Sequence, residues 1–181
     1  MNHAVEIWQT LLRATVDKKH PWRVVSFCTA GADGPAVRSV ILRGVDVEHK
    51  RLVFYTDSRS QKMTDLQHNA AVALLFWNPR SNEQLRLTGK AYCQTDDTVV
   101  NRHWERIPDY ARKDYATLSA PGATLNGEVL HDFSKAREHF TVLEVQAEQM
   151  DWLKLDREGH QRAGYIWNVE TGTWTETTLV P

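Results

Sequence analysis

The sequence has only two cysteines and lacks any long apolar run, and each shortage excludes a class of protein. Cys28 and Cys93 lie far apart and form no CxxC motif. This spacing disfavours a disulfide framework or a redox motif, and we expect two core residues in a reducing compartment. No apolar stretch approaches the length needed to cross a membrane, and Glu6 and Arg13 place charges within the N-terminal apolar pattern, unlike a signal peptide. These features predict a cytoplasmic protein.

An excess of charge of either sign is also missing. The 22 Lys and Arg residues are balanced by 23 Asp and Glu residues, for a net charge of −1. No overall field therefore attracts nucleic acid or an anionic membrane. Any phosphate must be bound by a local group of cations.

Motifs for metal, dinucleotide and triad chemistry are absent. The eight histidines form no HExxH or HxH pair, and His131 and His139 have no acidic partner at ligand spacing, which disfavours a metal site. No GxGxxG follows a strand-like run, which disfavours a dinucleotide-binding fold. The order of residues identifies no Ser-His-Asp triad, so no catalytic residue is assigned.

A length of 181 residues, with 41% hydrophobic and 25% charged residues, is typical of one globular domain, which we expect to span residues 1–181. Apolar residues recur at helical spacing in residues 4–19, which predicts an amphipathic helix that ends at His20-Pro21. The apolar stripe of this helix is expected to consist of Val5, Trp8, Leu11, Leu12, Thr15 and Val16.

Strand-like runs follow, separated by turn-forming clusters. They lie at residues 23–29, 38–43, 52–56, 70–77, 83–93, 140–146, 149–155, 162–169 and 174–180. Residues 70–77 are nearly all apolar, which predicts a barrel strand that is buried on both faces. Helical patterns interrupt the strands at 63–68, 95–106 and 110–118, and after Ser134. The chain is therefore predicted to be mainly β with helical insertions (α+β), as an antiparallel barrel.

Residues 38–62 carry the strongest functional signal. In the strand at 38–43, alternation places Arg38 on the face opposite to Arg43. The next strand leads into a loop of hydroxyls and cations that precedes a helical pattern. A helix N-terminus has free N–H groups and partial positive charge, so Ser60 and Lys62 there suit a phosphate oxygen. A polar turn with a capping serine is the alternative for this loop taken alone.

The order of these residues resembles the FMN-binding half of the pyridoxamine 5′-phosphate oxidase family. Arg38 opens one strand, Tyr55-Thr56 ends the next, Ser60 and Lys62 follow in the loop, and Gln84 lies on the polar face of a later strand. Trp152, Arg162 and a final tryptophan-to-proline strand extend the resemblance over residues 23–181. It implies an antiparallel FMN-binding split β-barrel, an FMN-dependent oxidoreductase and a homodimer with FMN at its interface.

The resemblance also implies roles for single residues. Arg38 and Lys62 would hold the FMN phosphate, Gln84 would bond the flavin, and Trp152 and Arg162 would come from the second subunit. Charge-assisted bonds to phosphate and a flat tryptophan contact are physically suited to these roles. Core packing for Trp152 and a surface position for Arg162 remain open alternatives. The other implied cofactor contacts are Ser39, Val40, Ile41, Leu42, Arg43, Tyr55, Thr56, Ser60 and Gln61.

The substrate side departs from the family pattern. His103 lies where a tyrosine is expected, Arg106 is one place out of register, and Ala111 replaces a serine. Glu158 replaces an arginine, and a carboxylate there would repel a phosphate. The implied substrate-binding residues are Arg43, His103, Arg106 and His160. We therefore expect an oxidoreductase with an altered substrate that is not a vitamin B6 compound, or alternatively a flavin- or small-ligand-binding barrel without turnover.

Overall fold

The computed structural model describes residues 3–32 and 34–181, and in this part of the chain eight strands form one antiparallel sheet. The strand order is β3-β2-β1-β4-β5-β6-β7-β8, and β3 also pairs with β6, which closes the first six strands into a barrel. The strands are β1 (Val24–Gly31), β2 (Gly34–Asp46), β3 (Arg51–Asp57), β4 (Ala71–Asn78), β5 (Glu83–Cys93), β6 (Phe140–Lys154), β7 (Gln161–Asn168) and β8 (Thr173–Thr178).

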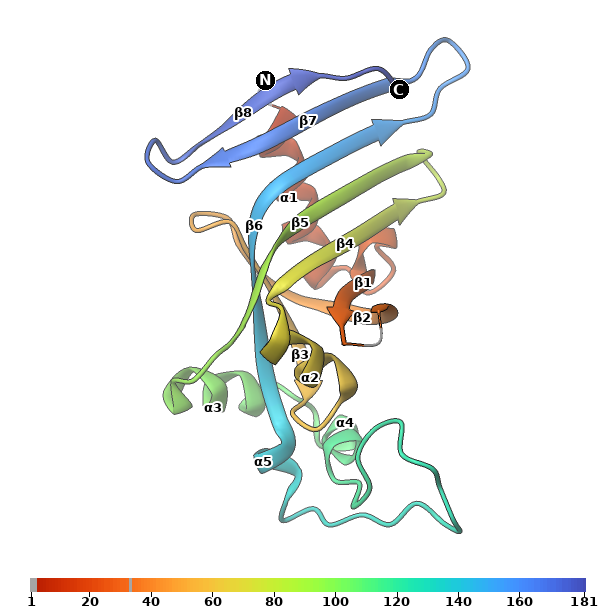
Figure 1. Cartoon of the computed structure of the whole chain (residues 1–181), viewed down its shortest axis with the longest axis vertical. Helices are drawn as coiled ribbons and strands as arrows, with labels where there is room; N and C mark the ends of the chain where they lie inside the picture. The colour runs from red at the N-terminus through yellow and green to blue at the C-terminus, as the bar shows by residue number, and fades with distance from the viewer. Residues whose placement is uncertain (1–2, 33) are drawn as a thin grey trace.

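Helix α1 lies along one face of the sheet, behind β5 and β6 in the view of Figure 1. Strands β7 and β8 extend the sheet at one end, and α3, α4 and α5 gather at the other. The helices are α1 (His3–Val16), α2 (Gln61–His68), α3 (Asp97–Glu105), α4 (Asp109–Arg112) and α5 (Ala136–His139), with 3-10 turns at Pro21–Arg23 and Lys113–Tyr115. None of the described helices is both long and apolar enough to cross a membrane.

Strand β6 joins the barrel to its extension. Residues 140–146 pair with β3, whereas residues 149–154 pair with β7. The prediction of two separate strands here was wrong, because pairing with β5 continues from Leu143 to Lys154 and shifts register only between Thr88 and Gly89. A Cβ at Gly89 would lie 1.9 Å from the carbonyl oxygen of Gln146, so only glycine allows this close approach.

Helix α1 packs one face on the core, but that face differs from the predicted stripe. Val5, Leu12 and Val16 are 53%, 39% and 78% exposed, so their prediction as packing residues was wrong. Alanines complete the buried face and allow the helix to approach the sheet closely. The buried residues of α1 are Ala4, Ile7, Trp8, Leu11 and Ala14.

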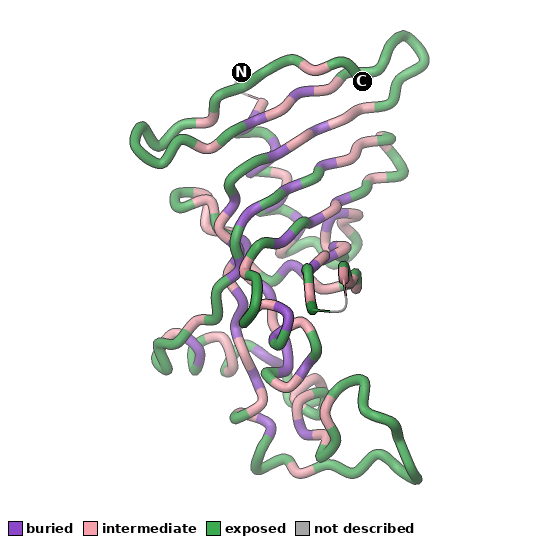
Figure 2. Tube along the Cα trace, in the orientation of Figure 1, coloured by how far each residue is buried: buried purple, intermediate pink, exposed green. Residues whose placement is uncertain are grey.

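Strand β4 alternates between buried and exposed residues instead of being buried on both faces (Figure 2). Val72, Leu74 and Phe76 point into the core, while Trp77 is 41% exposed. The prediction failed because a closed barrel has only one inward face, and apolar residues also occupy the outward face of this strand. The outward face is therefore apolar and uncovered within one chain.

Three smaller predictions also need correction. The predicted helix at 110–118 is limited to α4 and one 3-10 turn. Cys28 is partly buried and Cys93 is exposed, so neither is a fully buried core residue. Ser134 does not cap α5, because its hydroxyl donates instead to Asp132 at 2.6 Å.

Candidate functional site

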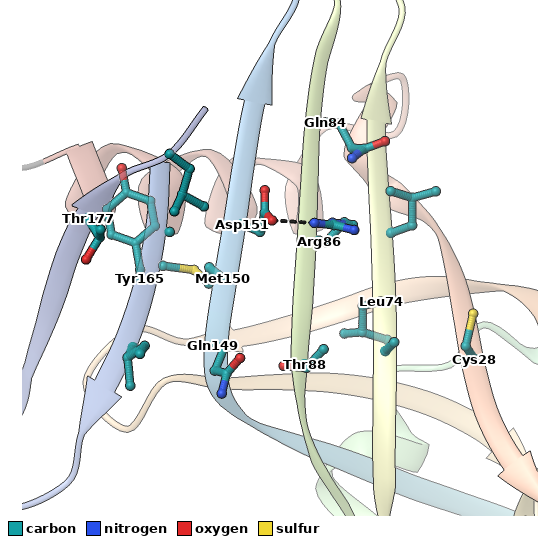
Figure 3. A pocket seen from close by; sticks show the side chains of 15 residues that line it. Cys28, Leu74, Gln84, Arg86, Thr88, Gln149, Met150, Asp151, Tyr165 and Thr177 are labelled. Carbon is teal, nitrogen blue, oxygen red and sulfur yellow. Dashed lines mark hydrogen bonds and ion pairs between the residues drawn. The ribbon is translucent and has the colours of Figure 1, made fainter. Parts of the chain in front are cut away.

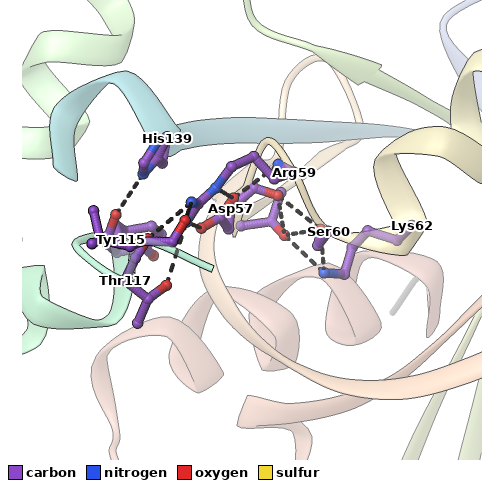
Figure 4. A network of polar contacts seen from close by, with 9 residues as sticks. Asp57, Arg59, Ser60, Lys62, Tyr115, Thr117 and His139 are labelled. Atoms are coloured by element: carbon purple, nitrogen blue, oxygen red, sulfur yellow. Dashed lines mark hydrogen bonds and ion pairs between the residues drawn. The ribbon is translucent and has the colours of Figure 1, made fainter. Parts of the chain in front are cut away.

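Hydroxyl groups and an ammonium group meet at the start of α2. Lys62 Nζ donates to Thr56 Oγ1 at 2.8 Å and to Ser60 Oγ at 2.9 Å, and Ser60 Oγ donates to the Asp57 carbonyl at 2.7 Å (Figure 4). Thr56 and Ser60 are both buried. Ser60 is the N-cap residue of α2, but its side chain makes no capping hydrogen bond. Its hydroxyl oxygen instead accepts a hydrogen bond from the Lys62 ammonium.

Lys62 has no carboxylate at ion-pair distance among the residues that the structure describes. Burial lowers the pKa of its ammonium, and the charge of Arg38 lowers it further, while Asp57 and Asp65 oppose these effects from a greater distance. A partly buried cation that contacts only hydroxyls lacks a counterion. An anion placed here would supply one.

Arg38 reaches the same end of the barrel from β2. Its guanidinium donates to Thr29 Oγ1 at 2.6 Å and to the Ala36 carbonyl at 3.1 Å, and it forms an ion pair with Asp65 at 3.3 Å. We call Arg38, Thr56, Ser60 and Lys62 the barrel-end cluster. The cluster brings together the four residues that the sequence predicted for a phosphate and the end of the preceding strand.

The rest of residues 38–43 has mixed accessibility. Ser39 and Arg43 are exposed, and Val40 and Ile41 are partly buried. Leu42 is fully buried in the core and pairs with Phe54 of β3, so its side chain is not accessible to a ligand. Gln61, also predicted, is exposed at the first turn of α2 and donates to Asp65 at 3.1 Å.

A second group of predicted residues surrounds Tyr55 on β3. The Tyr55 hydroxyl lies 2.9 Å from His103 Nδ1, and the Arg43 guanidinium lies 5.3 Å from the centre of its ring. Burial raises the pKa of Tyr55, and Arg43 and Arg106 lower it. Burial and then Arg106 lower the pKa of His103. Arg43 and Arg106 therefore place two cations near Tyr55, and His103 contributes a hydrogen-bonding partner.

A hydrogen-bond network that the sequence did not predict connects the segment after α4 to the loop before α2 (Figure 4). Arg59 donates to both carboxylate oxygens of Asp57, at 3.0 and 2.7 Å, and to the Thr117 carbonyl at 2.9 Å. His139 Nδ1 lies 2.9 Å from the Tyr115 carbonyl oxygen, and the Ser58 N–H donates to the His139 carbonyl. These contacts fix the chain beyond α4 against the loop before α2.

The other predicted residues lie elsewhere in the chain. A groove of about 850 Å³ crosses the outward face of β4 to β8, and Gln84 and Arg86 line it (Figure 3). Asp151 in this groove accepts from Arg162 at 3.1 and 2.8 Å and is also paired with Arg86. Arg162, followed by Arg86, holds the pKa of Asp151 below its usual range. We call this region the sheet-face groove.

Trp152 and His160 belong to neither group. The Trp152 side chain is 8% exposed and lies on the inner face, with its ring 4.2 Å from that of His3. His160 lies in the turn between β6 and β7, where its Nδ1 accepts from the Asp156 N–H at 3.1 Å.

Because β1 and β4 separate β2 from β5, about three strand spacings, or roughly 14 Å, lie between Arg38 and Gln84.

The fold is a split barrel, and the barrel-end cluster lies at one of its ends. Residues 5–95, half of the chain, match the family model described as the pyridoxamine 5′-phosphate oxidase, FMN-binding domain. The chain belongs to this family, and the domain that it contains is an FMN-binding one. The predicted family, split-barrel fold and cofactor are confirmed.

Relatives and solved structures agree with this assignment. A pyridoxine/pyridoxamine 5′-phosphate oxidase of Cytophaga hutchinsonii is 44% identical over 33% of this chain, but the match spans only 26% of that relative. A Psychrobacter oxidase of the same name is 29% identical over 87% of this chain and 79% of its own length.

Two solved structures share the fold over nearly the whole chain. A pyridoxamine 5′-phosphate oxidase-related, FMN binding protein from Nostoc punctiforme has a TM-score of 0.78 at 24% identity, covering 99% of this chain and 97% of that one. PhzG from Burkholderia lata has a TM-score of 0.73 at 16% identity, covering 99% and 92%.

Proposed function

We propose that this chain is an FMN-dependent oxidoreductase whose FMN phosphate binds at the barrel-end cluster. The observation that carries the proposal is the Lys62 ammonium, which is partly buried and contacts only the hydroxyls of Thr56 and Ser60. A phosphate ester supplies the missing counterion and forms charge-assisted hydrogen bonds with Lys62 and Arg38.

The bound flavin supplies a ring whose N5 accepts a hydride. In this proposal main-chain groups of residues 39–42 and the side chain of Tyr55 line the ribityl chain and the ring, because these residues continue from the barrel-end cluster along β2 and β3. Arg43, Arg106 and His103 surround Tyr55 and are placed to hold a polar group of the substrate.

A second copy of the chain completes the site in this proposal. Gln84 and Arg162 lie in one row across β5, β6 and β7, and Gln84 is about three strand spacings from Arg38. The outward face also exposes Trp77 and Ile166, at 41% and 59%. Covering this face with a second copy would bury apolar surface and bring Gln84 and Arg162 to the partner's flavin, with Trp152 supporting the strand from beneath.

The substrate in this proposal is less anionic than pyridoxamine 5′-phosphate. Ala111 has no hydroxyl and packs against an apolar cluster that includes Phe140 and Val142. Glu158 is exposed in the turn that also holds His160. A carboxylate in that turn repels a dianionic phosphate, so the proposal excludes efficient vitamin B6 turnover. Cys93 is exposed and free, which suits a cytoplasmic location where thiols stay reduced.

The test begins with the visible spectrum of freshly purified protein and the identity of the flavin released on denaturation. Flavin reduction by pyridoxamine 5′-phosphate is then followed in the parent, in Glu158→Arg and in the control Glu170→Arg. The control makes the same charge change in the turn between β7 and β8. We expect FMN in the protein, slow reduction in the parent and faster reduction only in Glu158→Arg. Reduction at ordinary oxidase rates in the parent, or slower reduction in Glu158→Arg, contradicts the proposed substrate site.

A further inference from the structure

A carboxylate is buried directly beside the barrel-end cluster, on α2. Asp65 is 4% exposed, and it accepts hydrogen bonds from Thr29 at 2.5 Å, from Gln61 at 3.1 Å and from Arg38 at 3.3 Å. The Thr29 bond is the first cause of the lowered pKa of Asp65, so the group is a carboxylate at neutral pH. A buried anion next to a site for an anionic ligand requires an explanation.

The backbone makes space for this carboxylate. A Cβ added to Gly31 would lie 2.5 Å from Asp65 Oδ1 and 3.0 Å from its Cγ. The φ angle of Gly31 is outside the left-handed region, so the residue is needed there for space and not for its conformational freedom. Any other residue at position 31 displaces the Asp65 side chain.

The three side chains form a directed chain of hydrogen bonds. Arg38 Nη1 donates to Thr29 Oγ1 at 2.6 Å, and the same hydroxyl donates its own proton to Asp65 Oδ2. Arg38 Nη2 contacts Asp65 Oδ2 as well. Two of the three nitrogens of the guanidinium therefore bond to groups that sit behind it, and its rotamer is fixed by this support.

We propose that Asp65 is a positioning residue: through Thr29, and with the space that Gly31 provides, it holds the Arg38 guanidinium beside Lys62 so that the site distinguishes a phosphate ester from an uncharged hydroxyl. This inference rests on the proposed function, because it takes the ligand phosphate to be that of FMN. No other described carboxylate contacts Arg38. The role differs from that of Asp57, which binds Arg59 and the loop.

The proposal opposes a simple electrostatic expectation. If Asp65 acted only as a nearby negative charge, removing that charge would strengthen the binding of a phosphate. If Asp65 positions Arg38, the same change weakens phosphate binding, because the guanidinium loses its fixed geometry. The two accounts predict effects of opposite sign on one measurable quantity.

That quantity is the phosphate preference, the ratio of the dissociation constants of riboflavin and FMN. It is measured by flavin fluorescence quenching in the apo form of the parent, Asp65→Asn, Gly31→Ala and the control Asp46→Asn, whose carboxylate is paired with His49 on the surface. We expect the preference to fall about tenfold in Asp65→Asn and Gly31→Ala, the effect of one weakened charge-assisted bond. The riboflavin constant and the control are expected to stay unchanged.

Gly31→Ala keeps every polar group and displaces only the carboxylate, so it supplies the result if Asp65→Asn does not fold. An unchanged or increased phosphate preference in the folded variants overturns the positioning role while leaving the proposed function intact. An equal fall in riboflavin and FMN affinity shows a purely structural effect and also overturns it. A parent that binds both flavins equally contradicts the proposed phosphate site itself and, with it, this inference.

Discussion

The barrel-end cluster and the sheet-face groove differ in how complete they are within one chain. In the cluster, Lys62 is held by two hydroxyls and Arg38 by Thr29 and Asp65, so its cations are already oriented. In the groove, Arg162 and Arg86 are paired with Asp151 on an open face. Among the described residues Lys62 of the first region has no carboxylate partner, whereas in the second region the two arginines share the carboxylate of Asp151 beside exposed apolar residues.

Because of this difference, the two regions are suited to bind different kinds of ligand. An oriented cation without a counterion is suited to bind an anion, whereas an apolar face with internally paired charges is suited to contact another protein surface. In the proposed dimer the groove of one copy would close over the cluster of the other.

A side chain added at Gly89 is predicted to disrupt the pairing of β5 with β6 where β6 passes from the barrel to its extension. In Gly89→Ala the new Cβ meets the Gln146 carbonyl oxygen, which belongs to backbone, so β5 and β6 must separate where β6 passes from the barrel to its extension. We expect a loss of about 3 kcal/mol or more in the free energy of unfolding, measured by chemical denaturation.

Gly164→Ala is the matched control for this prediction. Its added Cβ would lie 3.1 Å from Leu179 Cδ1, which is the end of a flexible side chain. We expect a change below about 1 kcal/mol. Equal losses of unfolding free energy in the two variants would show that the close approach at Gly89 is not required for the pairing of β5 with β6.

The cluster was largely predictable from the sequence because its signals are local. Ser60 and Lys62 lie two residues apart at the start of a helix, and strand alternation separates Arg38 from Arg43. Each of these statements depends only on near neighbours in the chain. Turn-forming clusters also marked many strand ends, but β2 runs from Gly34 to Asp46 where residues 38–43 were predicted, and the break predicted within β6 is absent.

The residues that the sequence missed act through contacts between distant segments. Arg59 binds the Thr117 carbonyl, 58 positions away, and Asp65 binds Thr29, 36 positions away. No periodicity or motif indicates such pairs. The two-sided burial predicted for β4 failed for a related reason, since apolar residues on an exposed face and in a core look alike in the sequence.

A charge placed on the apolar surface of the sheet-face groove is predicted to weaken the proposed dimer. Ile166 is 59% exposed in one chain, so a monomer would tolerate Ile166→Asp, whereas a dimer that covers this residue would bury an unpaired carboxylate. We expect the dimer dissociation constant, measured by sedimentation velocity, to rise about a hundredfold. Val16→Asp, on α1 and 78% exposed, should leave the dimer intact. A monomeric parent that binds FMN tightly would contradict the shared site.

The cluster is predicted to lose FMN affinity at alkaline pH. Burial lowers the pKa of Lys62, so in the apo protein stability rises with pH between this lowered pKa and the usual value of 10.5. FMN has the opposite linkage, because it binds the ammonium form. The phosphate preference should fall by up to about tenfold per pH unit above the lowered pKa. Burial raises the pKa of Tyr115 to about 12, so that residue does not titrate in this range. A preference that stays flat up to pH 10 would argue against Lys62.

The most direct test of the central claim is the affinity of Lys62→Met for FMN, with riboflavin as the reference ligand and Lys19→Met, an exposed lysine beyond α1, as the control. Because the substitution removes one charge-assisted contact with the phosphate, we expect the FMN dissociation constant to rise about ten- to a hundredfold. The riboflavin constant and the control should not change. Equal FMN affinity in Lys62→Met and the parent would contradict the assignment of the phosphate to the barrel-end cluster.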